Sequence, residues 1–524
     1  MPVSDVQTVS LFVLVLLAAA SALSQVTRVP YPIVLVIGGS LIGFVPHLPA
    51  LHLEPEVVLF VFLPPLLYDA AYTSSVRDLR ASARVITLSA VGLVLATTAV
   101  VATALHAAVE GLSWAAAFAL GAIVSPTDPL AASQIGRRLG LPSRSITVIE
   151  GEALVNDGSA LALYQTAVAV AAGGAFSVWR AGGLFVVEVL GGVVVGLVVA
   201  LVMDWVFRHA GRDQLLRLVL SLTCGYLAYL PAEELHLSGV LAVVTAGLVM
   251  GHREPVLTDA STRLRNGAFW QILVFLLNGV LFATVGLQLP AVLRDQDRSA
   301  GTLVALGLLV SVATIATRMV WTHVITWVIR GVDRREAQRA RRASWQARTV
   351  GAWCGLRGAV SLAAALGLPA DFPERDLLVF LALCVIWATL VGQGLTLPWL
   401  IRVLGVEDDG VVAREELHAR KAATKAALDE LERLDAAEWT RQDTIERMRG
   451  LYEFRRRRLL QRAGRPETDE DSESRSRDYQ RIVRTVLDAQ RRELVRLRDT
   501  GEIGAEAMRV VEQELDLEEE RLDS

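Results

Sequence analysis

Apolar residues run through the first 405 positions of the chain in long stretches, separated by short loops that carry most of the charge. Each stretch is close to the roughly 20 residues that a helix needs to cross the hydrocarbon core of a bilayer. The pattern predicts an all-α membrane protein with thirteen spans, at 6–24, 31–46, 54–72, 85–108, 113–134, 146–173, 180–207, 214–232, 236–252, 268–289, 302–329, 349–370 and 376–404.

The pattern changes at about Glu407, where a charged tail begins. Of the 106 charged residues in the chain, 55 lie in the last 119 positions, and Leu428, Leu431 and Leu434 recur there at helical spacing. This predicts a membrane domain over 1–405 and a cytoplasmic domain of amphipathic helices over 406–524, with a polar break at 466–477. The tail is either a regulatory or dimer-stabilising appendage or a solvated helical hairpin.

Composition narrows the class of protein further. With 53% hydrophobic residues and a mean hydropathy of +0.44, the chain cannot be a secreted globule, a collagen-like chain or a wholly disordered protein. The membrane part carries 27 Lys/Arg against 24 Asp/Glu, so nucleic acid is not an expected partner. The three cysteines have no zinc or redox spacing. The N-terminus has no basic residue before its apolar run, which favours a retained first span over a cleaved signal.

Loop arginines predict the orientation, because Lys and Arg are concentrated in short cytoplasmic loops. Placing the N-terminus outside puts 19 loop arginines inside and leaves four outside, and it puts the tail in the cytoplasm. The inside set comprises Arg28, Arg77, Arg80, Arg84, Arg137, Arg138, Arg144, Arg208, Arg212, Arg253, Arg263, Arg265 and seven arginines between Arg330 and Arg348.

The fifth span contains an acid within a predicted helix break, Ser125-Pro-Thr-Asp-Pro129. Two prolines remove backbone donors, so a regular helix cannot continue through this stretch. Ionisable groups at membrane depth are costly, and broken helices are tolerated there where they line a watery cavity. Asp128 is therefore a candidate for an ion pathway; a proline kink capped by Asp128 is the alternative.

The sixth span adds a second polar set, Glu150-Gly-Glu-Ala-Leu-Val-Asn-Asp-Gly158. At about 100° per residue, Glu152 and Asn156 share one face and Asp157 lies a quarter-turn from Asn156. Asp157 can then face a cavity together with Asp128, whereas Glu152 points toward neighbouring helices and needs a buried cation. Arg318 in the eleventh span is the expected partner.

The twelfth span is also interrupted, at Gly355-Leu-Arg-Gly358. If the seventh span is a linker, spans 1–6 and 8–13 form two six-helix units, inverted in the membrane, with Asp128 and Arg357 each in the fifth position. This arrangement matches transporters in which discontinuous helices cross, and Arg357 would neutralise the half-helix C-termini. The alternative is an arginine that snorkels to water. Asp69, near the cytoplasmic end of the third span, is either a site residue or an acid at the membrane edge.

Five ordered segments resemble the monovalent cation:proton antiporter family, which includes bacterial and animal sodium/proton exchangers. The resemblance covers nearly all of residues 1–405, and the segments are Phe62–Tyr72, Ser125–Pro129, Glu150–Gly158, Ser238–Gly247 and Gly355–Ala363. It implies a homodimer in which spans 1–3 and 7–10 form a scaffold, and spans 4–6 and 11–13 form a core that moves like an elevator.

The resemblance also implies roles for individual residues. Asp157 matches the essential cation and proton carrier, and Thr127 and Asp128 match residues that line its site. Asn156 stands where electrogenic relatives have a second aspartate, which implies electroneutral exchange. The remaining matches are Glu152 and Arg318 with a buried ion pair, Arg357 with a charge-compensating arginine, Asp69 with an acid near the cavity, and Ala153 with a position where many bacterial relatives have a ligating serine.

These observations predict an antiporter that exchanges sodium for protons across a bacterial-type plasma membrane. A single carboxylate that binds either a hard cation or a proton gives obligate exchange. The alternatives are a potassium/proton exchanger, an intramembrane aspartyl hydrolase that uses Asp128 and Asp157, and a channel, which is disfavoured because no filter-like loop or gating-charge helix is visible. No cofactor is expected; the expected partners are the bilayer, protons, and sodium, potassium or lithium.

Overall fold

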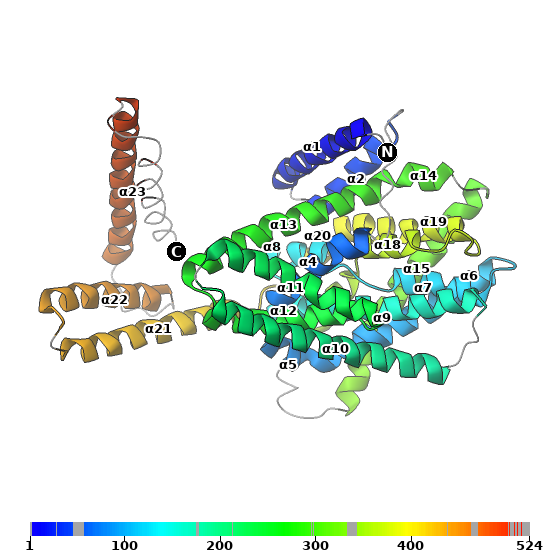
Figure 1. The fold of residues 1–524 in the computed structure, drawn as a ribbon, viewed down its shortest axis with the longest axis horizontal. Helices are drawn as coiled ribbons and strands as arrows, with labels where there is room; N and C mark the ends of the chain where they lie inside the picture. Colours follow the sequence, from blue (N-terminus) through cyan, green and yellow to red (C-terminus); the bar gives the residue numbers. More distant parts are fainter. Residues whose placement is uncertain are drawn as a thin grey trace. The chain divides into compact units, whose positions relative to one another are not determined.

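The computed structural model describes most of the chain, and every secondary-structure element in the described parts is a helix (Figure 1). Those parts are residues 3–27, 29–45, 57–173, 178–211, 213–294, 296, 298–332, 343–437, 439–462, 470–500, 502, 508, 511 and 515. Arg28, Arg212, most of the arginines between 330 and 348, the end of the second predicted span and the start of the third therefore lie outside the described residues.

The contact pattern divides the chain into two compact units, Met1–Asp409 and Gly410–Ser524. The helices of the first unit are α1 (Val3–Thr27), α2 (Tyr31–Gly43), η1 (Val58–Phe62), α4 (Leu63–Tyr72), α5 (Val76–Thr87), η2 (Leu88–Leu93), α6 (Val94–Ala108), α7 (Trp114–Val124), α8 (Pro129–Arg138), α9 (Ser143–Ala171), α10 (Val178–His209), α11 (Gln214–Glu234), α12 (Gly239–Leu257), α13 (Ala260–Leu287), α14 (Leu289–Arg294), α15 (Ala300–Val332), α17 (Trp345–Trp353), α18 (Ala359–Leu366), α19 (Arg375–Ile386), η3 (Trp387–Gln393) and α20 (Gly394–Val403).

A helix, or a run of adjoining helices, occupies each of the thirteen predicted ranges. Within the described residues, eight segments are long and apolar enough to cross a membrane, and three shorter apolar helices are Leu11–Thr27, Tyr31–Gly43 and Val58–Tyr72. The remaining segments of this unit fall outside that set; they are α9 and the short helices α17 and α18, which have 9 and 8 residues. The largest boundary difference is in the fourth span, where Ser75 caps the start of α5 and the helix continues through η2 into α6.

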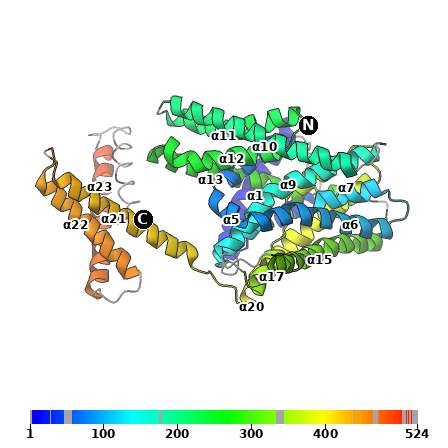
Figure 2. The ribbon, with the colours of Figure 1, turned by 90° about the horizontal axis from the view of Figure 1, so that it is seen from below.

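Two main hydrophobic clusters fill the first unit, Met1–Asp409, which we call the membrane unit. The larger one joins residues of α1, α2, α6–α9, α13, α15 and α17–α20. The smaller one joins α4, α10, α11, α12 and the first half of α13, and α10, α11 and α12 lie side by side in Figure 2. Helix α13 contributes to both clusters, so it links the two parts of the unit.

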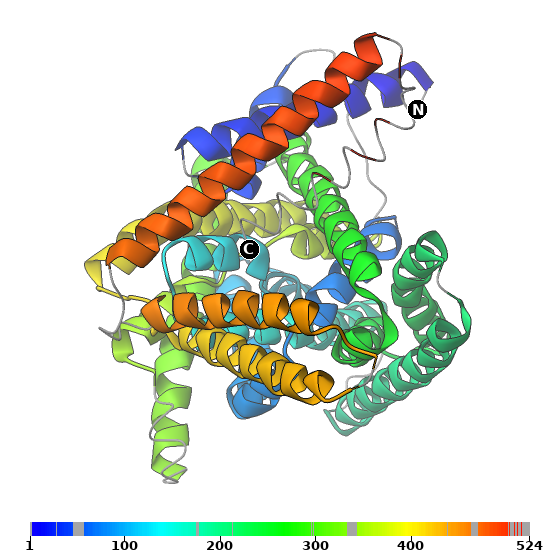
Figure 3. The same cartoon turned by 90° about the vertical axis from the view of Figure 1, so that its left-hand side faces the viewer.

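The second unit contains α21 (Val411–Asp435), α22 (Gln442–Arg462) and α23 (Glu470–Asp499). Helices α21 and α22 run alongside each other (Figure 3), and Arg449 forms an ion pair with Asp435 at 3.0 Å. The predicted break at 466–477 is wrong from Glu470 onward, where α23 is already helical. Polar composition misled the prediction, because Glu and Arg have good helix propensity and acidic residues favour a helix N-terminus.

Candidate cation-binding site

The first helix break lies between α7 and α8, at residues 125–128. Pro129 occupies the first turn of α8, where its missing N–H costs nothing. Asp128 caps that helix, since its Oδ1 accepts a hydrogen bond from the Leu130 N–H at 2.8 Å. At the other end of the break, the Ser125 hydroxyl donates to the Ala122 carbonyl oxygen at 2.9 Å. The break is thus a defined structure that holds Thr127 and Asp128 in place.

The second break lies between α17 and α18, at residues 354–358. Glycine is required at two of its positions because neighbouring residues come too close for a side chain. A Cβ on Gly355 would lie 2.6 Å from Arg318 Nε, and a Cβ on Gly358 would lie 2.7 Å from Asp128 Cβ. Neither position has room for a side chain, so these glycines allow the chain to pass directly beside Arg318 and Asp128.

The two breaks contact each other through backbone and guanidinium hydrogen bonds. The Asp128 N–H donates to the Leu356 carbonyl oxygen at 2.8 Å. Arg357 donates from Nε to the Val124 carbonyl at the end of α7 at 2.8 Å, and from Nη1 to the Gly355 carbonyl. A positive charge is favourable at carbonyls freed by a helix C-terminus. Arg357 is 1% exposed, so it is a buried counter-charge for the break and does not snorkel to water.

Helix α9 brings a polar side chain against the first break. Asn156 Nδ2 donates to the Thr127 hydroxyl at 2.9 Å, and both residues are buried. The carbonyl oxygen Oδ1 of Asn156 is buried without a hydrogen-bond partner among the described residues. This bond fixes the amide orientation and leaves an oxygen free for another ligand.

Asp157 directly follows Asn156 in the sequence and is 8% exposed. Within the described residues, no hydrogen bond or ion pair involves its carboxylate. Asp128 is close enough to interact with it electrostatically. The structure therefore gathers Asp157, Asp128, Asn156 and Thr127 around α9 and the first break, and their side chains offer oxygen atoms of the type that hard cations bind.

Five residues before Asp157 on α9, a second carboxylate has a protein partner. Glu152 Oε1 forms a buried ion pair with Arg318 Nη1, and the two side chains are 5% and 4% exposed. Arg318 Nε also donates to the Ala352 carbonyl oxygen at 3.1 Å, near the end of α17. This ion pair joins α9, α15 and α17 behind the second break. Ala153, also buried, adds no oxygen to the cluster.

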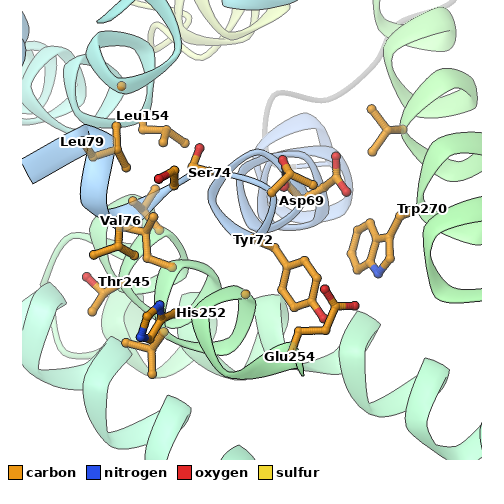
Figure 4. Close-up of a pocket in the computed structure, with 18 of the residues that line it drawn as sticks. Asp69, Tyr72, Ser74, Val76, Leu79, Leu154, Thr245, His252, Glu254 and Trp270 are labelled. Atoms are coloured by element: carbon orange, nitrogen blue, oxygen red, sulfur yellow. Dashed lines mark hydrogen bonds between the residues drawn. The ribbon is translucent and has the colours of Figure 1, made fainter. Parts of the chain in front are cut away.

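A cavity of about 1650 Å³ approaches the cluster from one end of the membrane unit. Figure 4 shows Asp69 and Tyr72 of α4, Glu254 of α12 and Trp270 of α13 around it. Leu130 and Gln134 of α8 and Leu154 and Val155 of α9 also line the cavity. The cavity thus reaches Val155, directly before Asn156, whereas Asp157 is not among its lining residues. Asp69 lies in the cavity wall, apart from the Asp157 cluster.

Sequence reasoning missed several polar residues of this region. Tyr31 at the start of α2 interacts electrostatically with Asp128, and Thr389 accepts a hydrogen bond from the Arg357 N–H at 3.1 Å. Glu254 belongs to the cavity wall, although the predicted ninth span ends at residue 252. The only sequence signal for Glu254 is an acid directly before Pro255 at the end of an apolar stretch.

Comparison with known proteins gives three consistent results. Residues 12–403 match the family profile described as "Sodium/hydrogen exchanger, transmembrane". The chain is 36% identical over 527 residues to an uncharacterised Na⁺/H⁺ exchanger of Mycobacterium tuberculosis, covering 98% of this chain and 96% of that protein. It is 31% identical to the sodium, potassium, lithium and rubidium/H⁺ antiporter of Bacillus subtilis, covering 76% of this chain and 61% of that protein.

The fold is also similar to a solved structure. The sodium proton antiporter MjNhaP1 of Methanocaldococcus jannaschii superposes with a TM-score of 0.59 at 18% identity, covering 76% of this chain and all of that one. At this level of identity the comparison shows the fold of the membrane unit.

Proposed function

The chain belongs to the sodium/hydrogen exchanger family, and from that membership we propose that it exchanges sodium for protons, one for one, at a single site centred on Asp157. It is a multi-pass membrane transporter for cation/proton exchange and not an enzyme, so the aspartyl hydrolase alternative is set aside. Asp128, Thr127 and Asn156 complete the proposed site.

One observation carries the proposal: Asp157 is a buried carboxylate with no partner within the described protein. An ionised carboxylate in that position costs several kcal/mol, on the order of the penalty for any unpaired buried charge. A bound proton removes the charge, and a bound cation neutralises it. Because one carboxylate cannot do both at once, the empty ionised site is the least stable form, and this competition couples cation movement to proton movement.

We further propose elevator-like alternating access. The four site residues lie on α7–α9, and Arg357 and Arg318 lie on the α17–α18 break and α15; all of these belong to spans 4–6 and 11–13, the proposed moving core. The fixed scaffold is formed by spans 1–3 and 7–10, which supply Asp69, Tyr72 and Glu254 to the cavity wall. The contacts between the two breaks support the proposed pair of inverted six-helix repeats with crossed discontinuous helices.

The proposed orientation makes the large cavity an inward-facing entrance. Its lining includes Arg77, Arg80, Arg253 and Arg263, which belong to the loops and helix ends expected in the cytoplasm. We therefore propose a plasma-membrane homodimer with the N-terminus outside, the tail in the cytoplasm, and the cavity that approaches the site open to the cytoplasm in this conformation. Asp69 would contribute a negative charge along the cation's path.

Electroneutral exchange follows from the charge count at the site. Asn156 cannot titrate, and Asp128 is held as a helix cap beside the Arg357 break, so Asp157 alone changes its ligand. The test is the sodium gradient that just cancels an imposed proton gradient in voltage-clamped liposomes. That null point should stay the same at every membrane potential; a shift with voltage would show that a second group, with Asp128 the first candidate, also exchanges a proton.

Sodium is the proposed cation, with potassium as the second candidate because the Bacillus subtilis relative is described as acting on sodium, potassium, lithium and rubidium. Liposomes that contain the purified protein and a pH-sensitive dye should report proton movement on addition of sodium. Potassium, lithium and choline are added in turn, and liposomes with Asp157→Asn protein serve as the control. A response to potassium alone would identify potassium, and not sodium, as the substrate. No response to any of the cations would contradict cation/proton exchange at this site.

A further inference from the structure

A second, much smaller cavity lies behind the wall of the large one, between α4, α11, α12 and α13. Its volume is about 10 Å³, which is about enough for one water molecule. Tyr72, Glu254 and Asn266 line both cavities, so these three side chains form the partition between them. Tyr72 and Glu254 lie next to each other in Figure 4.

Polar atoms without partners surround this small cavity. Within the described residues, the hydroxyls of Tyr68 and Thr262 and the carbonyl oxygen Oδ1 of Asn266 are buried and make no hydrogen bond. Their residues are 0%, 4% and 6% exposed. A buried polar group that lacks a partner costs about 1–3 kcal/mol, so several such atoms around one cavity indicate a shared ligand. Thr262 also lies beside the helix cap Asp259, and the Tyr68 hydroxyl lies near the side chains of Ser221 and Cys224. Asn266 Oδ1 is therefore the main evidence for a shared ligand.

We propose that this cavity is a binding site for one structural water molecule, which donates to Asn266 Oδ1 and bonds to the hydroxyl of Tyr68. Buried waters typically make about three hydrogen bonds to groups that the protein leaves unsatisfied. Tyr68 lies on α4 and Asn266 lies on α13. The water therefore bridges these two helices directly behind the cavity wall and keeps Tyr72 and Glu254 in position there.

Charge distinguishes water from a bound cation at this site. Glu254 and Arg217 both line the cavity, so their formal charges cancel. Arg217 stays next to it because its guanidinium donates to the carbonyl oxygens of Gly211 and Leu257. A cation at a buried site needs a net negative surrounding, whereas water needs only donors and acceptors.

The direct test is a crystal structure of the full chain at about 2 Å or better, determined in sodium and again with thallium(I) in its place. We expect one density peak within hydrogen-bonding distance of Tyr68 Oη and Asn266 Oδ1, without an anomalous thallium signal. An empty cavity overturns the proposal, and so does a thallium signal, because it would assign a cation site.

A stability measurement gives a second, independent test. Tyr68→Phe and Asn266→Leu should each lower the Tm by about 1–3 °C. The double variant should lose less than the sum, because either change already deprives the shared water of a partner. The matched control is Tyr229→Phe combined with Asn266→Leu, since Tyr229 is a buried tyrosine outside both cavities, and that pair should be additive. Additivity of Tyr68→Phe with Asn266→Leu would overturn the water bridge.

Discussion

Glu152 and Asp157 lie on the same helix, about one and a half turns apart, but only Glu152 has a charged partner in the fold. Glu152 is neutralised by Arg318, which in turn bonds to the Ala352 carbonyl oxygen. Asp157 has no protein partner within the described residues, and it directly follows Asn156, whose Oδ1 is buried without a hydrogen-bond partner among them. Both carboxylates are buried, so burial alone does not identify the working acid. The difference in partners separates an acid that stabilises the structure from one that can bind an exchangeable ligand.

The largest expected effect is the loss of transport in the Asp157→Asn variant. The amide keeps the size and polarity of the side chain but loses the charge and the titratable proton, so exchange should fall to the level of protein-free liposomes. The Tm should stay the same or rise, because an unpaired buried charge is removed. Dye-reported exchange and thermal unfolding check both expectations.

Glu150→Gln is the matched control on the same helix, because Glu150 pairs with the exposed Arg137 at 2.8 Å on the protein surface. It should retain exchange. If Asp157→Asn retains substantial exchange, Asp157 is not the carrier and the contrast with Glu152 has no functional meaning.

Asp128→Asn should reduce exchange strongly but less completely. Asparagine can still cap α8 by accepting from the Leu130 N–H, so the break should keep its shape while the second negative charge near Asp157 is lost. Asp128→Ala removes the cap as well and should cost about 1 kcal/mol more in stability. Initial exchange rates at several sodium concentrations measure the first effect; full activity of Asp128→Asn would remove this acid from the site.

Breaking the Glu152–Arg318 pair tests the other side of the comparison. Glu152→Ala and Arg318→Ala should each lower the free energy of unfolding by about 3–5 kcal/mol, because each leaves one buried charge unpaired. The double variant should lose less than the sum of the two. Denaturation of all four proteins in one detergent measures the coupling, and strict additivity would show that the two residues do not stabilise each other.

Removal of the tail after about residue 406 should have the smallest effect on the site. Every predicted span and every site residue precedes that position, so the shortened protein should insert and exchange ions, with changes confined to regulation or dimer stability. Size-exclusion chromatography and liposome exchange test this together. An intact but inactive dimer would show that the tail takes part in transport.

The sequence determined the class of fold and the location of both helix breaks, because these depend on local properties. The length of apolar stretches reflects membrane thickness, Pro126 and Pro129 interrupt a helix wherever it packs, and the spacing of Glu152, Asn156 and Asp157 follows from helical geometry. These same local rules failed in the tail at Glu470, where polar composition did not prevent a helix.

Only the tertiary structure decided which buried polar groups have partners. The bond from Arg357 to the Val124 carbonyl joins residues 233 positions apart, and the ion pair of Glu152 with Arg318 joins residues 166 positions apart. Helical spacing predicted different surroundings for Glu152 and Asp157, with Arg318 as the partner of Glu152. Only the tertiary structure shows that Arg318 contacts Glu152 and that Asp157 has no protein partner within the described residues. That distinction depends on how α9, α15 and the two breaks pack, as does the placement of Tyr72 and Glu254 in the cavity wall. Packing over long sequence separations is the property that a one-dimensional pattern does not contain.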